Sequence, residues 1–404
     1  MAKTLPSEII TKILTRLAVK DLLRYRGVSK PWCSLIDGPD FIKLHLDHSK
    51  RTNTNLNAVL FRDNNLAWVD LDALSPAVKL NHPIDDDRRV DVMGSCNGLL
   101  ALSNSSNDIV FWNPSTKRYK KLPISNVNVN VSTSSARNLD FYGFGHDPVT
   151  DDYKLVKITF LAGNPFDSEV KVYSAKANSW KRINKAFPYF IDLKTQYGVY
   201  ASNALHWFVA GKYPSHIPEL VVAIDLVTGE YREIPLPEYD KADNSVFMFL
   251  DGLGGSLCLT CNYVKKTVSS YRVDIWVMKE YGVRDSWTKM FTVKPSKAIG
   301  TFLFVTPVAY LKSGEQVILN QECERFITYD LQRKKAKNLR ISGLPERFRA
   351  QACVGSLVGL NGGWDGENES GKKKNTDKMQ GNKKKDLNRK QRDDFLSKGF
   401  KLVL

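Results

Sequence analysis

The sequence lacks any long hydrophobic run. No window of its 404 residues approaches the roughly 18 consecutive apolar residues that a membrane span needs. No charged segment followed by an apolar core opens the chain. A secretory leader and a membrane anchor are therefore not expected, and we expect the protein to reside in the cytoplasm, the nucleus or both.

Cysteine is also scarce. The six cysteines are widely scattered: Cys33, Cys96, Cys258, Cys261, Cys323 and Cys353. This pattern is untypical of a disulfide scaffold and favours a reducing compartment. Cys258 and Cys261 form a C-x-x-C pair, but a spacing of three on a strand points the two thiols to opposite faces. Because no second pair completes a zinc site, neither a metal site nor a cofactor is expected.

Catalytic signatures are missing as well. The six histidines show no H-E-x-x-H spacing, and His206, beside Trp207, is most simply a strand residue. Neither a G-x-S-x-G elbow nor a Gly-rich phosphate loop occurs. No catalytic residue is therefore predicted, although an enzyme of another class remains an alternative.

Acidic residues are too few to balance the basic ones, and the formal net charge is +16. Residues 365–404 hold 12 Lys and Arg against 7 Asp and Glu, with lysine clusters at 372–374 and 383–385. This tail has no apolar period and is predicted to be disordered, and its clusters are candidates for a nuclear import signal. The remaining charge is diffuse, so nucleic-acid binding, which needs charge gathered on one face, is a minor alternative.

What the sequence does contain is a repeat of short strand signals from about residue 57 to residue 360. Equivalent third strands hold Val172, Ala223, Ile275 and Ile327, at intervals of 51, 52 and 52 residues. A period of about fifty with four short strands is typical of one β-propeller blade, as in kelch repeats. Six blades fit best, while five or seven remain compatible with the spacing.

The two ends of the repeat predict how the ring closes. The first unit has only three strand signals, and the segment around residues 350–360 holds a strand without a partner. If this C-terminal strand completes the first blade, no strand edge stays free. We therefore expect an α plus all-β chain: a helical domain at 1–49, a closed β-propeller at 50–360 and a basic low-complexity tail at 361–404.

The opening of the chain is helical. In SEIITKILTRL the apolar residues, including Ile9, Ile13 and Leu17, fall on one face of a helix. Two more short helices are predicted, one beginning near Asp21 and one capped by Ser29. Three such helices cannot bury all of their apolar surface, so the remainder needs a partner or docks on the propeller.

The order of motifs resembles one family. The stretch L-P-x-E-I-x-x-x-I-L-x-R-L, followed by V-K-D-L-L-R-x-R-x-V-S-K-x-W, strongly resembles a plant F-box. GSCNGLLAL, FWNPSTKRYKKLP, FGHDPVTDDYKLVKI and VYSAKANSWKRI resemble successive motifs of the F-box-associated domain. The resemblance covers residues 5–341, which is most of the chain.

This resemblance implies the substrate-recognition subunit of an SCF-type ubiquitin ligase. The F-box would bind a Skp-type adaptor, which connects it to cullin and RING subunits, and the propeller would bind a target protein for ubiquitination. Such a subunit performs no bond chemistry. It holds the target near a ubiquitin-charged conjugating enzyme. An adaptor-independent propeller binding module and a propeller enzyme are the alternatives.

The resemblance also assigns residues to the adaptor interface, with the last two of them supporting the third helix: Leu5, Pro6, Ile9, Ile13, Leu14, Leu17, Val19, Leu22, Val28 and Trp32. One position departs from the family pattern. Ala18 stands where the family usually has proline, which would fix φ before the second helix. We expect this change to affect adaptor affinity rather than abolish binding.

The target is expected on the propeller face opposite the short turns between third and fourth strands. Longer links emerge there, and recognition usually resides in such loops on a rigid scaffold. Aromatic residues in these links are candidate anchors, or alternatively fill gaps between blades: Phe166, Tyr189, Phe190 and Tyr213.

Overall fold

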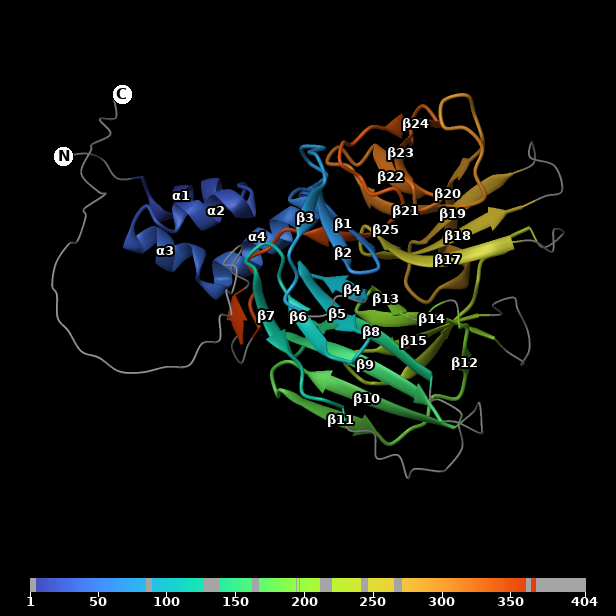
Figure 1. Cartoon of the computed structure of the whole chain (residues 1–404), viewed down its shortest axis with the longest axis horizontal. Coiled ribbons are helices and arrows are strands. Elements are labelled where there is room, and N and C mark those ends of the chain that lie inside the picture. The colour runs from blue at the N-terminus through green and yellow to red at the C-terminus, as the bar shows by residue number, and fades with distance from the viewer. Residues whose placement is uncertain are drawn as a thin grey trace, which may run out of the picture. The chain divides into compact units, whose positions relative to one another are not determined.

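A computed structural model describes residues 5–84, 89–125, 139–161, 167–193, 195, 197–210, 220–240, 246–264, 271–360 and 365–367. The chain divides into two units, residues 1–368 and 369–404, and all of the described residues belong to the first. The lysine clusters and most of the tail therefore lie outside the described residues. Figure 1 labels most helices and strands of the first unit.

Four helices open this unit: α1 Ser7–Leu14, α2 Val19–Tyr25, α3 Lys30–Ile36 and α4 Pro39–Thr52. The first three match the short helices predicted from the sequence. α3 begins as expected, because the Ser29 hydroxyl accepts a hydrogen bond from the Trp32 N–H at 3.3 Å, with Pro31 in the first turn.

The fourth helix goes beyond the three-helix prediction. α4 starts with Pro39 after Gly38 and ends at Asn53, whose left-handed φ of 47° stops the helix. The expected domain boundary after Ser49 falls inside α4. This helix therefore belongs to both the helical domain and the connection to the sheets.

The described strands form five hydrogen-bonded sheets (Figure 1). The first has the order β25 Arg349–Val354, β1 Leu56–Arg62, β2 Asn65–Asp70, β3 Val78–Leu80. The second has the order β26 Gly366–Glu367, β7 Arg118–Lys121, β6 Ile109–Trp112, β5 Leu99–Asn104, β4 Val90–Cys96.

Two more sheets have four strands each. One has the order β17 Val246–Leu253, β18 Ser256–Tyr263, β19 Arg272–Met278, β20 Trp287–Val293, with the short 3-10 helix η2 Arg284–Ser286 before its last strand. The other has the order β21 Val305–Tyr310, β22 Gln316–Gln321, β23 Arg325–Asp330, β24 Lys335–Leu339.

The fifth sheet has nine strands, in the order β11 Ser179–Ile183, β10 Ser168–Ser174, β9 Asp152–Phe160, β8 Leu139–Asp147, β13 Tyr197–Ala201, β14 Ala204–Ala210, β15 Leu220–Asp225, β16 Tyr231–Ile234, with β12 Phe190–Ile191 paired to β14. Four sheets thus have the size of one blade, and the prediction of six separate blades does not hold for the described strands. The repeat predicts two blades where this single sheet stands.

A parallel pairing causes the merger. β8 and β13 place Tyr142 opposite Tyr197 and Gly143 opposite Gly198. A Cβ on Gly143 would lie 2.8 Å from Cζ2 of Trp207, and one on Gly198 would lie 2.4 Å from the same atom. The two glycines therefore let both backbones approach the indole closely enough for the strands to pair.

The predicted closure by a C-terminal strand is confirmed. β25 pairs antiparallel with β1, with Leu56 opposite Val354 and Phe61 opposite Arg349. In Figure 1 the red-orange β25 lies beside the blue β1. The inner strands β25, β4, β8, β13, β17 and β21 each contact the next, and β21 contacts β25. The sheets are therefore arranged as a β-propeller.

The apolar core lies between consecutive sheets. The rings of Phe111 on β6 and Phe144 on β8 have centroids 4.7 Å apart. Phe291 on β20 stacks on Tyr329 of β23 at 4.3 Å. Such aromatic pairs add about 0.5–1.5 kcal/mol to the stabilisation from burial, so they hold neighbouring sheets together.

Four third strands end at or next to an Asp or Asn that forms the same turn. Its Oδ1 accepts hydrogen bonds from the backbone N–H groups two and three residues later, at Asp70, Asn113, Asp225 and Asp330. Such Asx turns close tight hairpins to the fourth strands. Four of the repeats predicted from the sequence therefore share one kind of turn.

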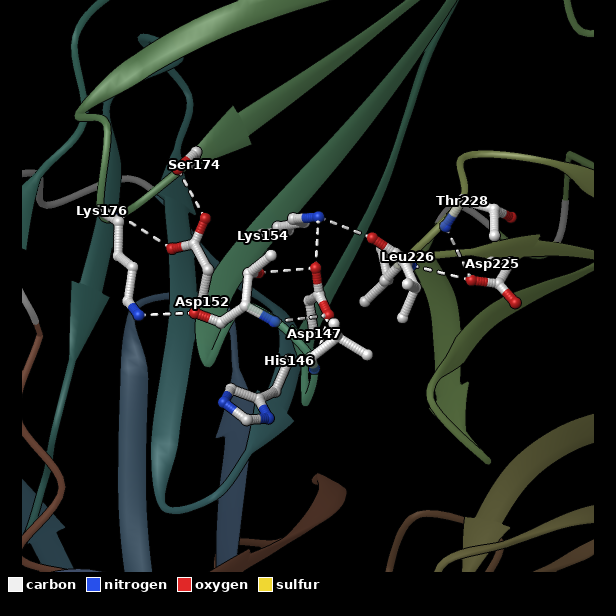
Figure 2. Close-up of polar contacts among 12 residues, drawn as sticks. His146, Asp147, Asp152, Lys154, Ser174, Lys176, Asp225, Leu226 and Thr228 are labelled. Atoms are coloured by element: carbon white, nitrogen blue, oxygen red, sulfur yellow. Dashed lines mark hydrogen bonds and ion pairs between the residues drawn. The ribbon is translucent and has the colours of Figure 1, made fainter.

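A related turn joins β8 to β9 on the same side of the propeller (Figure 2). The Lys154 ammonium donates to Oδ2 of Asp147 at 2.7 Å and to the Leu226 carbonyl oxygen at 2.6 Å. Burial would raise the pKa of Asp147, but hydrogen bonds from Lys154 and Thr150 outweigh it and lower this pKa to about 2. Lys154 thus bridges the β8–β9 turn and the turn after β15.

Candidate functional site

One face of the helical domain is apolar and exposed. Leu5, Ile9 and Ile13 keep 58%, 43% and 50% of their surface accessible, and Pro6 is exposed beside them. Ile9 and Ile13 lie one helical turn apart on α1, so they share a side of the helix. We call Leu5, Pro6, Ile9 and Ile13 the apolar face.

Three of the residues predicted at the interface are instead buried. Leu14, Val19 and Leu22 are at most 5% exposed, and Leu14 and Leu22 pack with Ile36 and Phe41. Their burial fixes the helices against one another and leaves α1 to present its other side.

The remaining predicted residues differ in their placement. Leu17 and Trp32 are half-buried against this helical core, and the Trp32 ring meets Tyr25 edge-on at 5.8 Å. Val28 keeps 61% of its surface exposed, so it does not pack inside the helical domain, and its place in the adaptor interface stays a prediction. The β-branched side chain follows α2 in a turn that holds it outside the core.

Ala18 occupies a backbone conformation that suits proline. It is the N-cap residue of α2, with φ −67° and ψ 146°. Proline fixes φ near −65°, and no backbone hydrogen bond from the Ala18 N–H occurs within the described part of the chain. The alanine therefore keeps the backbone geometry that proline would have and loses only the restriction that proline places on φ.

α4 joins the helical domain to the propeller. Leu46 is 7% exposed and packs in a cluster with Cys96 and Leu99, with Ile42 against the same cluster. Lys50 donates to the side-chain oxygen of Asn97 in the β4–β5 turn. The helix is thus anchored on the side of the propeller that carries the tight turns.

A further anchor was missed by the sequence reasoning. Leu357, just beyond β25, packs against the helical core that contains Leu14. The Asn113 amide holds this segment by donating to the carbonyl oxygens of Ser356 at 3.1 Å and Val358 at 3.0 Å. No local signal could identify Leu357, because its partners lie more than three hundred residues earlier.

Two of the predicted target anchors pack on the sheets. The Tyr189 hydroxyl donates to Oε1 of Glu233 at 2.6 Å, which with burial raises the pKa of Tyr189 to about 12. The Phe190 ring lies 5.8 Å from that of Phe160. Both side chains are half-buried, which agrees with the gap-filling alternative. Phe166 and Tyr213 lie outside the described residues, so target binding by the four stays a prediction.

Possible catalytic groups have structural roles where the structure describes them. His206 is fully buried on β14, with Nδ1 3.0 Å from the Val199 carbonyl oxygen and Nε2 2.8 Å from the Tyr281 hydroxyl. Cys258 and Cys261 pack into different clusters on opposite faces of β18, as predicted. The described residues hold no group of three or more His, Cys, Asp or Glu placed to bind a metal ion.

A hollow of about 370 Å³ lies between α4 and the tight turns of the propeller. Its polar lining includes Lys50, Asn97, Tyr200 and Asn203. Among the described residues, no carboxylate or imidazole lines this hollow, and its ionisable side chains are those of Lys50, Cys96 and Tyr200.

None of the described helices is both long and apolar enough to cross a membrane. An exposed apolar face on a small helical domain, anchored through α4 to a propeller, defines a two-part binding protein. One part offers an incomplete apolar surface, and the other offers a rigid scaffold for loops.

Comparisons with known proteins give this class a family. Residues 3–44 match the F-box domain, and residues 53–361 match the F-box associated β-propeller domain. The chain is 40% identical over 420 residues to the F-box protein CPR1 of Arabidopsis thaliana, covering 99% of this chain and all of that protein. A second F-box protein of that plant is 31% identical over 417 residues, covering 99% of each. The chain belongs to the F-box proteins with an F-box associated β-propeller domain.

Among solved structures, the chain is similar to an oligogalacturonate lyase in complex with manganese. The TM-score is 0.37 at 10% identity, covering 69% of this chain and 70% of that one. A likeness this low carries no argument about fold or activity.

Proposed function

We propose that the protein is the substrate receptor of an SCF-type ubiquitin ligase. One observation carries this proposal: Ile9 and Ile13 are exposed on α1, although the opposite side of the same helix is buried through Leu14. The domain is too small to bury both apolar sides of this helix, and exposing the second side to water costs free energy. A partner that covers this side removes the cost. A Skp-type adaptor is the partner that the F-box implies.

In this function the protein acts by position rather than by chemistry. The adaptor would link the helical domain to cullin and RING subunits, and the propeller would hold the target. α4 supports this role, because it packs both in the helical core through Phe41 and against the propeller through Leu46. A stiff connection keeps the target at a fixed distance from the conjugating enzyme. This raises the effective concentration of the target near that enzyme.

Assembly with the ligase tests the proposal. Purified wild-type protein should capture the Skp-type adaptor and, through it, cullin and RING subunits. The double variant Leu5→Asp/Ile13→Asp should lose all three, because two charges would be buried in an apolar interface. A melting temperature equal to that of the wild type would show that the variant folds. Equal capture by both proteins would refute the proposal.

A further inference from the structure

Two paired strands, β1 and β25, connect two opposite sides of the propeller. β1 begins at Leu56, close to the end of α4, and runs to Arg62. β25 runs in the opposite direction, from Arg349 to Val354, next to the residue that bonds Asn55. A strand of seven residues spans about 20 Å. Arg62 and Arg349 therefore lie on the side of the propeller that faces away from α4.

Two hollows open on this side, one of about 310 Å³ and one of about 570 Å³. They share Arg62, Asp63 and Arg347 in their linings, so they adjoin across these residues. The first extends toward the start of β4, and the second extends along β2 to the end of β3. We call these two adjoining hollows together the basic hollow.

Cations predominate in the basic hollow. Its basic residues come from five separate positions in the chain: Arg62, Lys79, Arg89, Arg347 and Arg349. The acidic residues in its lining are Asp63, Asp91 and Glu346. All five cations have exposed side chains. The basic hollow thus presents an excess of positive charge to solvent.

Existing ion pairs leave part of this charge unmatched. Arg62 lies 3.5 Å from Asp63, Arg89 lies 2.9 Å from Asp91, and Arg347 lies 3.6 Å from Glu324. Among the described residues, neither Lys79 nor Arg349 forms an ion pair. Exposed pairs of this kind contribute at most about 1 kcal/mol, so an incoming carboxylate can compete for the arginines.

The floor of the hollow is apolar. Val90 and Phe348 are buried beneath the first part, and Leu66 is buried beneath the second. Phe348 keeps only 1% of its surface accessible, so its ring offers no platform on which a nucleic-acid base could stack. The exposed arginine forks above this buried floor instead suit the carboxylates of an acidic peptide.

From this geometry we propose that the basic hollow binds an acidic segment of the target protein. The inference rests on the proposed function, because it takes the occupant to be the target that the ligase receives. The carboxylates would pair with Arg349, Arg347 and Lys79. The location opposite α4 directs this segment away from the adaptor side.

A synthetic acidic polymer tests the proposal without knowledge of the target. The probe is the fluorescently labelled random copolymer of glutamate and tyrosine, and its binding to the full chain is followed by fluorescence anisotropy. Wild-type protein should bind it, and rising salt should weaken the binding. The variant Arg347→Glu/Arg349→Glu should bind roughly tenfold more weakly or worse, because attraction becomes repulsion.

A matched control separates the hollow from the general basic surface. Lys335→Glu/Lys337→Glu makes the same change of net charge on exposed residues of β24, outside the hollow's lining. This control should bind the copolymer as the wild type does. Equal losses in both variants would overturn the proposal, and so would binding of single-stranded oligo-dT in place of the copolymer.

Adaptor binding measured on the same samples keeps the two proposals apart. If wild-type protein captures the adaptor but not the copolymer, the acidic-segment inference fails and the receptor function stands. If it binds the copolymer at the hollow but not the adaptor, the receptor function fails, and the binding of acidic segments at the hollow stands. Both charge variants should retain the wild-type melting temperature.

Discussion

His45 on α4 donates a hydrogen bond from Nε2 to the Leu17 carbonyl oxygen at 2.9 Å, which fixes the long helix against the turn between α1 and α2. His45 is fully buried, and burial lowers its pKa, so the ring is held neutral. This contact belongs to the path that connects the apolar face with the propeller.

Replacing His45 by Phe should destabilise the helical domain. The variant keeps an aromatic ring, though a somewhat larger one, but leaves the carbonyl oxygen of Leu17 without its donor, which costs about 1–3 kcal/mol. Urea unfolding measures the loss. His48→Phe, three residues further along the same helix and partly exposed, is the control and should change the free energy of unfolding by much less. Equal losses would contradict the role given to His45.

Ala18→Pro should stabilise the protein. The φ of −67° at Ala18 already suits proline, so the change restricts the unfolded chain without straining the folded one. A gain of about 0.4–1 kcal/mol is expected in urea unfolding. Ala18→Gly should shift stability in the opposite direction. A destabilising proline would show that the turn before α2 needs a backbone freedom that the structure does not indicate.

Gly98→Ala should be strongly destabilising. Gly98 has φ +84°, and a Cβ there would lie 2.2 Å from Oγ of Ser356 and 2.5 Å from the Val354 carbonyl oxygen. Strain and clash together should exceed about 2 kcal/mol. Gly282→Ala is the control, because Gly282 has φ +81° but nothing within 4 Å of the added Cβ. Thermal melts should show a clearly larger loss at Gly98, and equal losses would mean that contact with Ser356 has no effect.

Acid should weaken the fold through His206. Burial lowers the pKa of His206 to about 4, below the unfolded value of 6.5. The folded state therefore binds fewer protons than the unfolded state in this range. The stabilisation is complete above the unfolded pKa and falls by up to about 3 kcal/mol as the pH drops toward the folded one.

His206→Gln should remove this pH dependence. The amide can hydrogen-bond but cannot take up a proton, so urea midpoints at neutral pH and at about pH 5 should lie closer together than in the wild type. The change of the urea midpoint between the two pH values can be compared even if the variant is less stable overall. The same change of the urea midpoint with pH in both proteins would show that His206 is not held neutral.

Much of the fold could be predicted because the repeat is local. Asp225 and Asp330 each form a turn with residues two or three positions later, so their recurrence is visible in the sequence. The pairing of β25 with β1 could also be predicted, since an unpaired strand at each end leaves one arrangement without a free edge. The merger of β8 with β13 could not, because it depends on how Gly143 and Gly198 meet around Trp207.

The candidate site was only partly predictable for a similar reason. Helical spacing marks Ile9, Ile13 and Leu14 as apolar, but it does not say which side of α1 the domain buries. That depends on packing with Phe41 and Leu357, which are remote in sequence. The basic hollow was not predicted at all, since its five cations come from four stretches of the chain, at residues 62, 79, 89 and 347–349, that meet only in the folded chain.

The most direct test of the central claim is the dissociation constant of the Skp-type adaptor for two single variants, measured by calorimetry against the wild type. Ile13→Asp places a charge on the apolar face, whereas Lys12→Asp introduces aspartate at the neighbouring exposed position, outside that face. We predict at least about a tenfold weakening for Ile13→Asp, which equals roughly 1.4 kcal/mol, and little change for Lys12→Asp. Equal affinities for Ile13→Asp and wild type would contradict the claim that this face is the adaptor-binding surface.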